Sequence, residues 1–291
     1  MMEGIAPEWD ANQTWRVFGG GAIFAAFPVV YGVLSSALYL PLMTFIAGLI
    51  FRGVKFEFRA HSTWKKHWNQ AFFFGSLIAV LSQGLVLGGI LTGIKVLGNH
   101  FAGGAFDWLN PFSIMVGIAL IPGYIMLGAS YLILKTAGPV QEKARRQAFG
   151  SGMAVLGFMA VVTVWTPFHY PLVWTNGFRA PRIYFGWIFP LMGLGSGYLL
   201  GKSLKARREK APLLGSIGLF LSGYFGLATS MDPYAIPPTV TLYKAAAQPE
   251  TMRFTLWGAV IVLPIVIACI VYSYSVFRGK VSPEGSSGSG G

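Results

Sequence analysis

The chain has 291 residues, of which 54% are hydrophobic and only 11% are Asp, Glu, Lys or Arg. Soluble domains carry about 25% charged residues, and a soluble core of this size could not bury so much apolar surface. The composition therefore excludes an ordinary soluble protein. In a membrane protein, the net charge of +12 reflects basic residues in the loops beside the bilayer, and it does not indicate a nucleic-acid partner.

The first expected membrane hairpin occupies residues 9–59. No Asp, Glu, Lys or Arg occurs between Val17 and Phe51. This run is too long for one span, because about 20 helical residues cross the hydrocarbon core. We expect a break centred on Gly32 and two spans on either side of it, near residues 12–31 and 33–51.

Six further apolar segments follow the hairpin. Hydropathy places them near residues 69–94, 111–134, 148–168, 183–201, 212–230 and 254–277. Every span must be helical, because backbone groups that face lipid find only intrahelical partners. The predicted fold is an all-α integral membrane protein with eight transmembrane helices packed as bundles. Residues 1–280 form this polytopic domain, and the Gly/Ser-rich residues 281–291 form a flexible tail.

The loops differ in charge and in length. Counting the loops between the eight predicted spans in chain order, lysine and arginine are concentrated in the second, fourth and sixth loops and in the C-terminal tail. Cytoplasmic loops carry such an excess, so we expect these loops and the C-terminus to face the cytoplasm. The last outward loop, residues 231–252, contains the segment MDPYAIPPTVT, whose three prolines oppose regular helix. We expect this loop to be an ordered, extended crossing.

Small residues recur at helical contact spacing in two of the predicted spans. The positions are Gly84 and Gly88, Gly89 and Gly93, and the ridge Gly193, Gly197 and Gly201. In lipid, small residues four apart let helix backbones approach closely. The pattern indicates either a tight bundle or a special interface between chains.

Residues suited to redox or transport chemistry are absent from the predicted spans. No span carries a charged residue in its middle, although ion-coupled carriers usually place one there. The histidines fall in or beside loops, so none projects inward to hold a haem; they are His61, His67, His100 and His169. We therefore expect no catalytic residue, no metal ion and no haem on this chain.

Two polar groups flank the first hairpin. Asp10 either caps the first helix, where a carboxylate satisfies free N–H groups, or stands at a water-accessible mouth and passes protons to a neighbouring subunit. At the other end, Arg52, Glu57 and Arg59 form either an ion-pair cluster that anchors a cytoplasmic loop or a functional group. The residues alone leave both alternatives open.

Four sequence blocks carry a resemblance to a known family. They are WDANQTW (Trp9–Trp15) with GGGAIFAAFPVVYG (Gly19–Gly32), RGVKFEFR (Arg52–Arg59), GYIMLGASYLILKT (Gly123–Thr136), and YAIPPTVTLYKAA (Tyr234–Ala246) with Leu263–Pro264. In this order they resemble subunit II of the cytochrome bd-type quinol oxidases. The form of RGVKFEFR is closer to the cyanide-insensitive branch.

The resemblance implies a partner. In this family subunit I carries haems b and d, oxidises quinol and reduces dioxygen to water. Subunit II binds no haem, pairs with subunit I and supports assembly, and some members hold a structural quinone. By position, Asp10 is implied in proton delivery, and Trp9 and Trp15 in the subunit contact or the oxygen route. The implied location is the bacterial cytoplasmic (inner) membrane.

This sequence departs from the family pattern at two places. Members begin with another transmembrane helix before the W-D-x-N block, which would make nine helices, and this sequence starts without it. Ala137 stands where the family often has Glu in a K-T-E-G run. The first departure puts a complete proton path within this chain in doubt, and the second weakens any role for that loop.

Two other classes of function remain to be weighed. A small-molecule transporter or permease would show an inverted repeat with broken spans at matching places, and the sequence shows no convincing repeat. A purely structural membrane scaffold would differ from an oxidase subunit only in lacking a redox partner.

Overall fold

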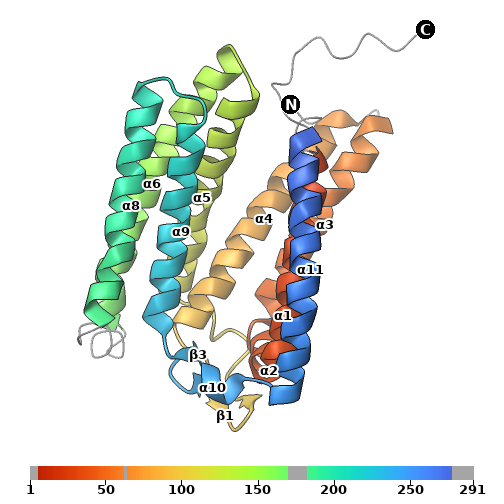
Figure 1. The fold of residues 1–291 in the computed structure, drawn as a ribbon, viewed down its shortest axis with the longest axis vertical. Coiled ribbons are helices and arrows are strands. Elements are labelled where there is room, and N and C mark those ends of the chain that lie inside the picture. Colours follow the sequence, from red (N-terminus) through yellow and green to blue (C-terminus); the bar gives the residue numbers. More distant parts are fainter. Residues whose placement is uncertain (1–5, 62–63, 170–181, 277–291) are drawn as a thin grey trace.

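The computed structural model describes residues 6–61, 64–169 and 182–276. Within them, eight long helices run between the two ends of the molecule (Figure 1). They are α1 (Ala6–Ala26), α3 (Tyr39–His61), α4 (Lys65–Leu91), α5 (Pro111–Lys135), α6 (Pro139–His169), α8 (Arg182–Lys205), α9 (Ala211–Met231) and α11 (Pro249–Val276). The predicted tail, residues 281–291, lies outside the described residues.

The helices have the length and composition of membrane spans. Five of them, α4, α5, α6, α9 and α11, are long and apolar enough to cross a bilayer. A bent pair made of the second half of α1 and the short helix α2 (Pro28–Ala37) could form a sixth span. A helical membrane fold is thus confirmed, whereas the predicted number of eight crossings is not settled by these criteria.

The predicted break at Gly32 is wrong, because the first hairpin breaks at two other places. α1 ends at Ala26, and α2 turns away from it by 119°. Pro28 is the cause: it has no N–H to continue the helix, and its ring keeps Phe27 out of the helical region, at φ −136° and ψ 63°. Gly32 lies inside α2. The second break is at Leu38, which is only 1% exposed.

The helices α5, α6, α8 and α9 pack as a group on one side of the molecule (Figure 1). The apolar core of this group includes Met126, Ile133 and Leu219, each 0% exposed. One buried hydrogen bond crosses it, between the hydroxyls of Ser130 and Ser216 at 2.7 Å. On the other side, α3 packs along α4, and α1 packs along α11.

α4 joins the two sides through close backbone contacts at glycine. A Cβ at Gly84 would collide with the backbone of Gly117 on α5, and one at Gly88 would collide with Ser113. On the opposite face of α4, Gly75 meets Gly48 of α3. These contacts favour bundle packing as the explanation of the glycine spacing in α4. In the second set, Gly193 and Gly197 also contact neighbouring side chains, but Gly201 has open space around it.

The lower end of the molecule in Figure 1 carries the irregular segments. Two antiparallel pairs of short strands lie there, β1 (Val96–Leu97) with β2 (His100–Phe101) and β3 (Tyr234–Ile236) with β4 (Val240–Thr241), followed by the short helix α10 (Leu242–Ala245). The amide of Ile94 donates to the carbonyl of Pro237 at 3.3 Å, and the amide of Ala247 donates to the carbonyl of Ala26 at 2.9 Å. The expected ordered crossing of the last loop is confirmed.

The glycine contacts of α4 can be tested by adding one methyl group. We predict that Gly84→Ala lowers the free energy of unfolding by about 1–3 kcal/mol, because the backbones of α4 and α5 must move apart. Gly128→Ala is the matched control, since a Cβ at Gly128 meets nothing within 4 Å. Thermal unfolding of the purified protein in detergent measures both. Equal stability of the two variants would contradict the close contact.

Candidate functional site

The W-D-A-N-Q-T-W segment lies within α1. Because α1 already runs from Ala6, the free N–H groups of its first turn precede Asp10. The helix-cap alternative for Asp10 is therefore wrong. The side chains of Trp9 and Asp10 lie outside the part of the chain that the structure describes, so their expected roles stay predictions.

Trp15 lies on an exposed face of α1. Its side chain is 39% exposed, and its ring meets that of Phe18 edge-on at 6.2 Å between centroids. Further along the same helix, Val17 is 77% exposed. The neighbouring helix α11 has no buried residue in its most apolar window, although it is strongly hydrophobic. Together α1 and α11 present a large apolar surface, which suits contact with lipid or another membrane chain.

The expected polar group at the end of the hairpin is on a helix. Arg52, Glu57 and Arg59 all lie in α3, which continues without interruption to His61, so the expectation that they form a loop is wrong. Because no proline occurs between Arg52 and His61, α3 continues beyond its apolar residues into this polar segment. The guanidinium of Arg52 stacks over the ring of Phe72 on α4 at 5.6 Å. The side chains of Glu57 and Arg59 lie outside the described residues.

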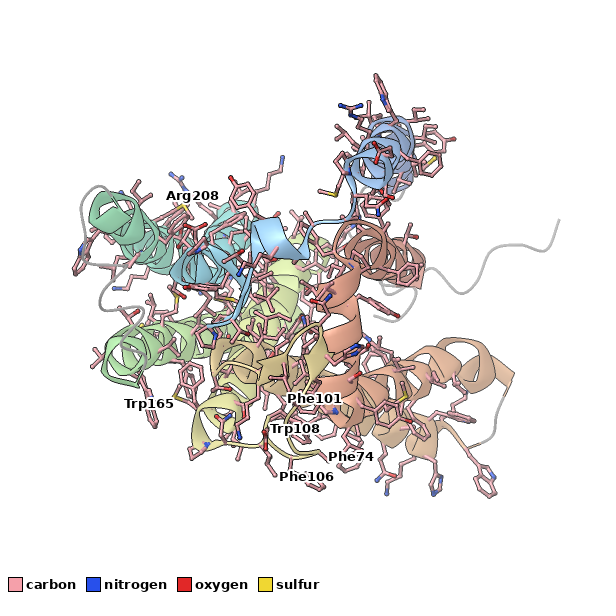
Figure 2. The ribbon with its side chains drawn as sticks, turned by 90° about the horizontal axis from the view of Figure 1, so that it is seen from below. Phe74, Phe101, Phe106, Trp108, Trp165 and Arg208 are labelled. Carbon is pink, nitrogen blue, oxygen red and sulfur yellow. The ribbon has the colours of Figure 1, made fainter. Side chains whose placement is uncertain are left out.

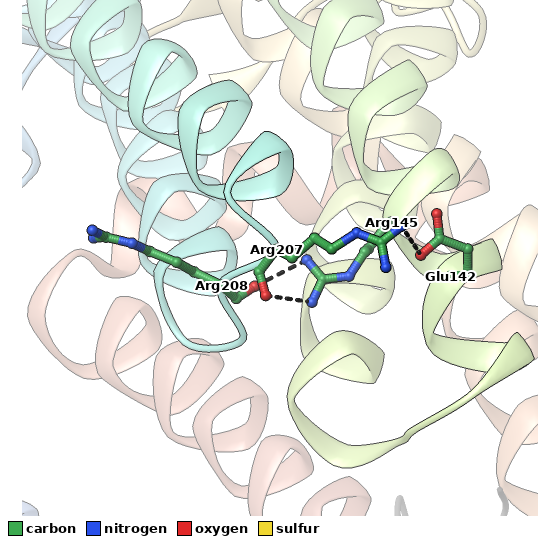
Figure 3. A network of polar contacts seen from close by, with 4 residues as sticks. All are labelled: Glu142, Arg145, Arg207 and Arg208. Atoms are coloured by element: carbon green, nitrogen blue, oxygen red, sulfur yellow. Dashed lines mark hydrogen bonds and ion pairs between the residues drawn. The ribbon is translucent and has the colours of Figure 1, made fainter.

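A polar network at the upper end was not expected from the sequence. Arg145 of α6 is 8% exposed, and its two terminal nitrogens donate to the backbone carbonyls of Arg208 and Arg207 at 3.0 and 2.9 Å (Figure 3). Arg207 has a positive φ of 52° and reaches Glu142 at 4.0 Å. This network holds the turn between α8 and α9 against α6.

A second connection at this end comes from Gln141. Its amide nitrogen donates to the carbonyls of Ile133 and Thr136 and to the carboxylate of Glu209, at 2.9, 3.1 and 3.2 Å. Ala137, the position that departs from the family pattern, is exposed in the turn between α5 and α6. The sequence signal was weak, because Arg145 and its neighbours read simply as part of a basic loop.

The described residues offer little for a bound group. No three His, Cys, Asp or Glu side chains within the described ranges gather closely enough to hold a metal ion. A surface depression of about 380 Å³ at the lower end is lined by Ser35, Ser36 and Tyr39, among others. Both serine hydroxyls donate to backbone carbonyls of α2, so they are not available as donors to a quinone. We assign no quinone to this depression.

Comparison with known proteins gives a consistent match along the chain. The family model described as cytochrome bd terminal oxidase subunit II matches residues 1–277. The cytochrome bd-I ubiquinol oxidase subunit 2 of Escherichia coli K12 is 28% identical, with 98% of this chain and 85% of that protein covered. The cytochrome bd ubiquinol oxidase subunit 2 of Bacillus subtilis is 29% identical, with 96% and 83% covered.

A solved structure shows the same fold. A chain of the bd oxidase from Geobacillus thermodenitrificans superposes with a TM-score of 0.78 at 16% identity. The match covers 95% of this chain and 84% of that chain. The arrangement of helices in Figure 1 is thus one already seen in a membrane oxidase.

The Arg145 network predicts a local change on mutation. Arg145→Ala removes two charge-assisted hydrogen bonds, each of about 1.5–3 kcal/mol, and should release the turn at Arg207 and Arg208. We expect trypsin to cleave this turn about tenfold faster. Arg146→Ala, at the exposed neighbouring position, is the control and should leave the cleavage rate unchanged. Equal cleavage of both variants would show that the turn does not depend on Arg145.

Proposed function

This chain belongs to the cytochrome bd terminal oxidase subunit II family, and on that premise we propose that it is the haem-free subunit of a bd-type quinol oxidase. It is a multi-pass membrane subunit of an oxidoreductase complex. The observation that carries the proposal is the family match over residues 1–277. The fold match at a TM-score of 0.78 supports it.

The proposed division of work gives the redox chemistry to the partner. Subunit I would carry haems b and d, oxidise quinol and reduce dioxygen to water, and this chain would support assembly. The exposed apolar surface of α1 and α11 favours this role, because so large a surface suits a neighbouring membrane chain. Trp15, exposed on α1, is a candidate for that contact, as is Trp9. No step of this proposal passes through a quinone held by this chain.

The proposed location is the bacterial inner membrane with the C-terminus in the cytoplasm. The upper end in Figure 1 joins α5 to α6 and α8 to α9. Those two turns and the helix ends beside them hold many of the chain's basic residues, among them Lys143, Arg146, Lys205 and Arg208. An excess of lysine and arginine favours the cytoplasmic side, and the end of α11 lies at this same end (Figure 1). The transporter alternative receives no support, since the relatives reported above are oxidase subunits.

One prediction of the proposed function concerns the partner. Affinity purification of this chain from its native membrane should recover a larger haem-bearing subunit, with haem bands in a reduced-minus-oxidised spectrum and quinol-driven oxygen uptake. The chain expressed without that partner is the control and should show neither property. A well-folded chain that recovers no haem protein would overturn the proposed function.

Another prediction of the proposed function concerns Asp10. If Asp10 passes protons to the partner, Asp10→Asn should lower quinol-driven oxygen uptake by about 100-fold or more, as expected when a proton-transfer group is lost. Glu8→Gln is the matched control, because it removes another carboxylate from the same helix two residues away. Haem content must stay constant in both variants. Unchanged uptake in Asp10→Asn would remove Asp10 from the proton route and leave the subunit role intact.

A further inference from the structure

One face of α8 changes from apolar to basic toward the upper end of the molecule. Five residues on it follow one another at intervals of three or four, so they share one side of the helix: Leu191, Leu194, Tyr198, Lys202 and Lys205. We call them the α8 stripe. The first three are 63%, 63% and 71% exposed, and both lysines are exposed as well. Within the described residues, no other part of the chain covers this face.

The α8 stripe lies at membrane depth. α8 follows α9 over most of its length, since a Cβ at Gly215 of α9 would meet Leu200 and one at Gly226 would meet Phe189. α9 is long and apolar enough to span a bilayer. Both Figure 1 and Figure 2 show α8 at an edge of the molecule remote from α1 and α11. The stripe is therefore separate from the apolar surface that the proposed function assigns to the partner subunit.

The charge of Lys202 is held toward the apolar part of the stripe. Its ammonium lies over the ring of Tyr198, at 5.8 Å from the ring centroid. Tyr198 is one turn further from the end of α8 at Lys205. A lysine near the end of a span usually extends toward water, whereas Lys202 places its charge where the apolar side chains begin. A cation at that boundary is stabilised by an anion at the same depth.

The surroundings of the stripe supply no such anion. α8 contains no Asp or Glu, and among the described residues neither Lys202 nor Lys205 forms an ion pair. In the turn that follows α8, the carboxylate of Glu209 accepts a hydrogen bond from Gln141. Arg208 adds another exposed cation, and its side chain extends away from the Arg145 network (Figure 3). The charge of this end of α8 therefore favours an anionic occupant.

The order of groups along the stripe matches the order of groups in a phospholipid. Leu191 and Lys205 are fourteen residues apart, which is about 21 Å along the axis. One leaflet of a bilayer, headgroups included, is about 20–22 Å thick. The leucines thus stand at the depth of acyl chains, and the lysines stand at the depth of headgroup phosphates. A soluble anion would use the lysines alone and leave the apolar part of the stripe without a role.

From these observations we propose that the α8 stripe binds one anionic phospholipid. Its phosphate is held by Lys202 and Lys205, and an acyl chain lies along Leu191 and Leu194. Tyr198 separates the two regions and positions the ammonium of Lys202. The site goes beyond the proposed function, because it requires only this chain and its membrane. It takes part in no redox step.

Native mass spectrometry of the full chain, purified with any subunit that accompanies it, tests the site. The probe is phosphatidylglycerol, and phosphatidylethanolamine with the same acyl chains is the zwitterionic reference. The unmodified chain should bind phosphatidylglycerol in preference. The double variant Lys202→Gln, Lys205→Gln should lower that preference by roughly 10- to 30-fold, because each lysine near an anionic headgroup contributes about fivefold in affinity.

The matched control removes two charges from the same end of the molecule. Lys143→Gln with Arg146→Gln changes two exposed positions of α6. These positions stand beside Glu142, whose carboxylate repels a phosphate, so the preference for phosphatidylglycerol should stay unchanged. A second control, Lys202→Arg with Lys205→Arg, keeps both charges and should keep the preference. The unfolding temperature of each variant is measured alongside, and it should not differ from that of the unmodified chain.

Three results would overturn the site. Equal loss in the α8 and α6 double variants would show that phosphatidylglycerol responds only to the overall charge of this end. Equal binding of the two lipids by the unmodified chain would show that no anionic headgroup is selected. A protein chain that is lost from the α8 double variant would identify a different occupant of this face. None of these results bears on the subunit role, which is tested by recovery of the haem-bearing partner.

Discussion

The close contact of α4 with its two neighbours is the constraint on which the rest of the structure depends. Lipid tails are as apolar as the side chains, so membrane helices gain little from hydrophobic burial and associate through tight packing and hydrogen bonds. The backbone of Gly84 meets Gly117 of α5, and that of Gly75 meets Gly48 of α3. These contacts place α3 on one face of α4 and the group of α5, α6, α8 and α9 on another. Two sides of α4 remain open between these contacts: the exposed side chain of Gln83 lies on one, and that of Phe74 lies on the other.

Hydrogen bonds at the two ends of the molecule add to the helix contacts that the glycines of α4 make. At the upper end, Arg145 and Gln141 fasten the turn between α8 and α9 to α6. At the lower end, the last loop reaches from the end of α9 to the carbonyl of Ala26 at the end of α1. Since α1 otherwise packs mainly on α11, this loop and the continuation of α1 into α2 connect the outer helix pair to the rest. The pair can therefore offer a wide apolar surface to another chain without separating from its own.

The fold and the candidate site were open to prediction to different degrees. Uncharged runs of about 20 residues impose helices, because no other structure satisfies the backbone in lipid, and most predicted spans match described helices within a few residues. The break in the first hairpin was misplaced, since Gly32 permits a turn but Pro28 enforces one. Arg145 and Gln83 were missed for a common reason. A basic residue in a loop and an amide in a span acquire a role only from the groups that other helices bring to them.

The sequence by itself determined that this chain is a helical membrane protein, where most of its helices lie, and which family it resembles. Those properties follow from composition, from the length of apolar runs and from short blocks of neighbouring residues, all of which are local. Only the tertiary structure decided that Gly84 serves the contact with α5, that Arg145 holds a turn sixty-two residues further along the chain, and that Gln83 of α4 accepts a hydrogen bond from Tyr124 of α5. The physical reason is that hydrogen bonds and close packing depend on which residues meet, and helix packing brings together residues that the sequence keeps far apart.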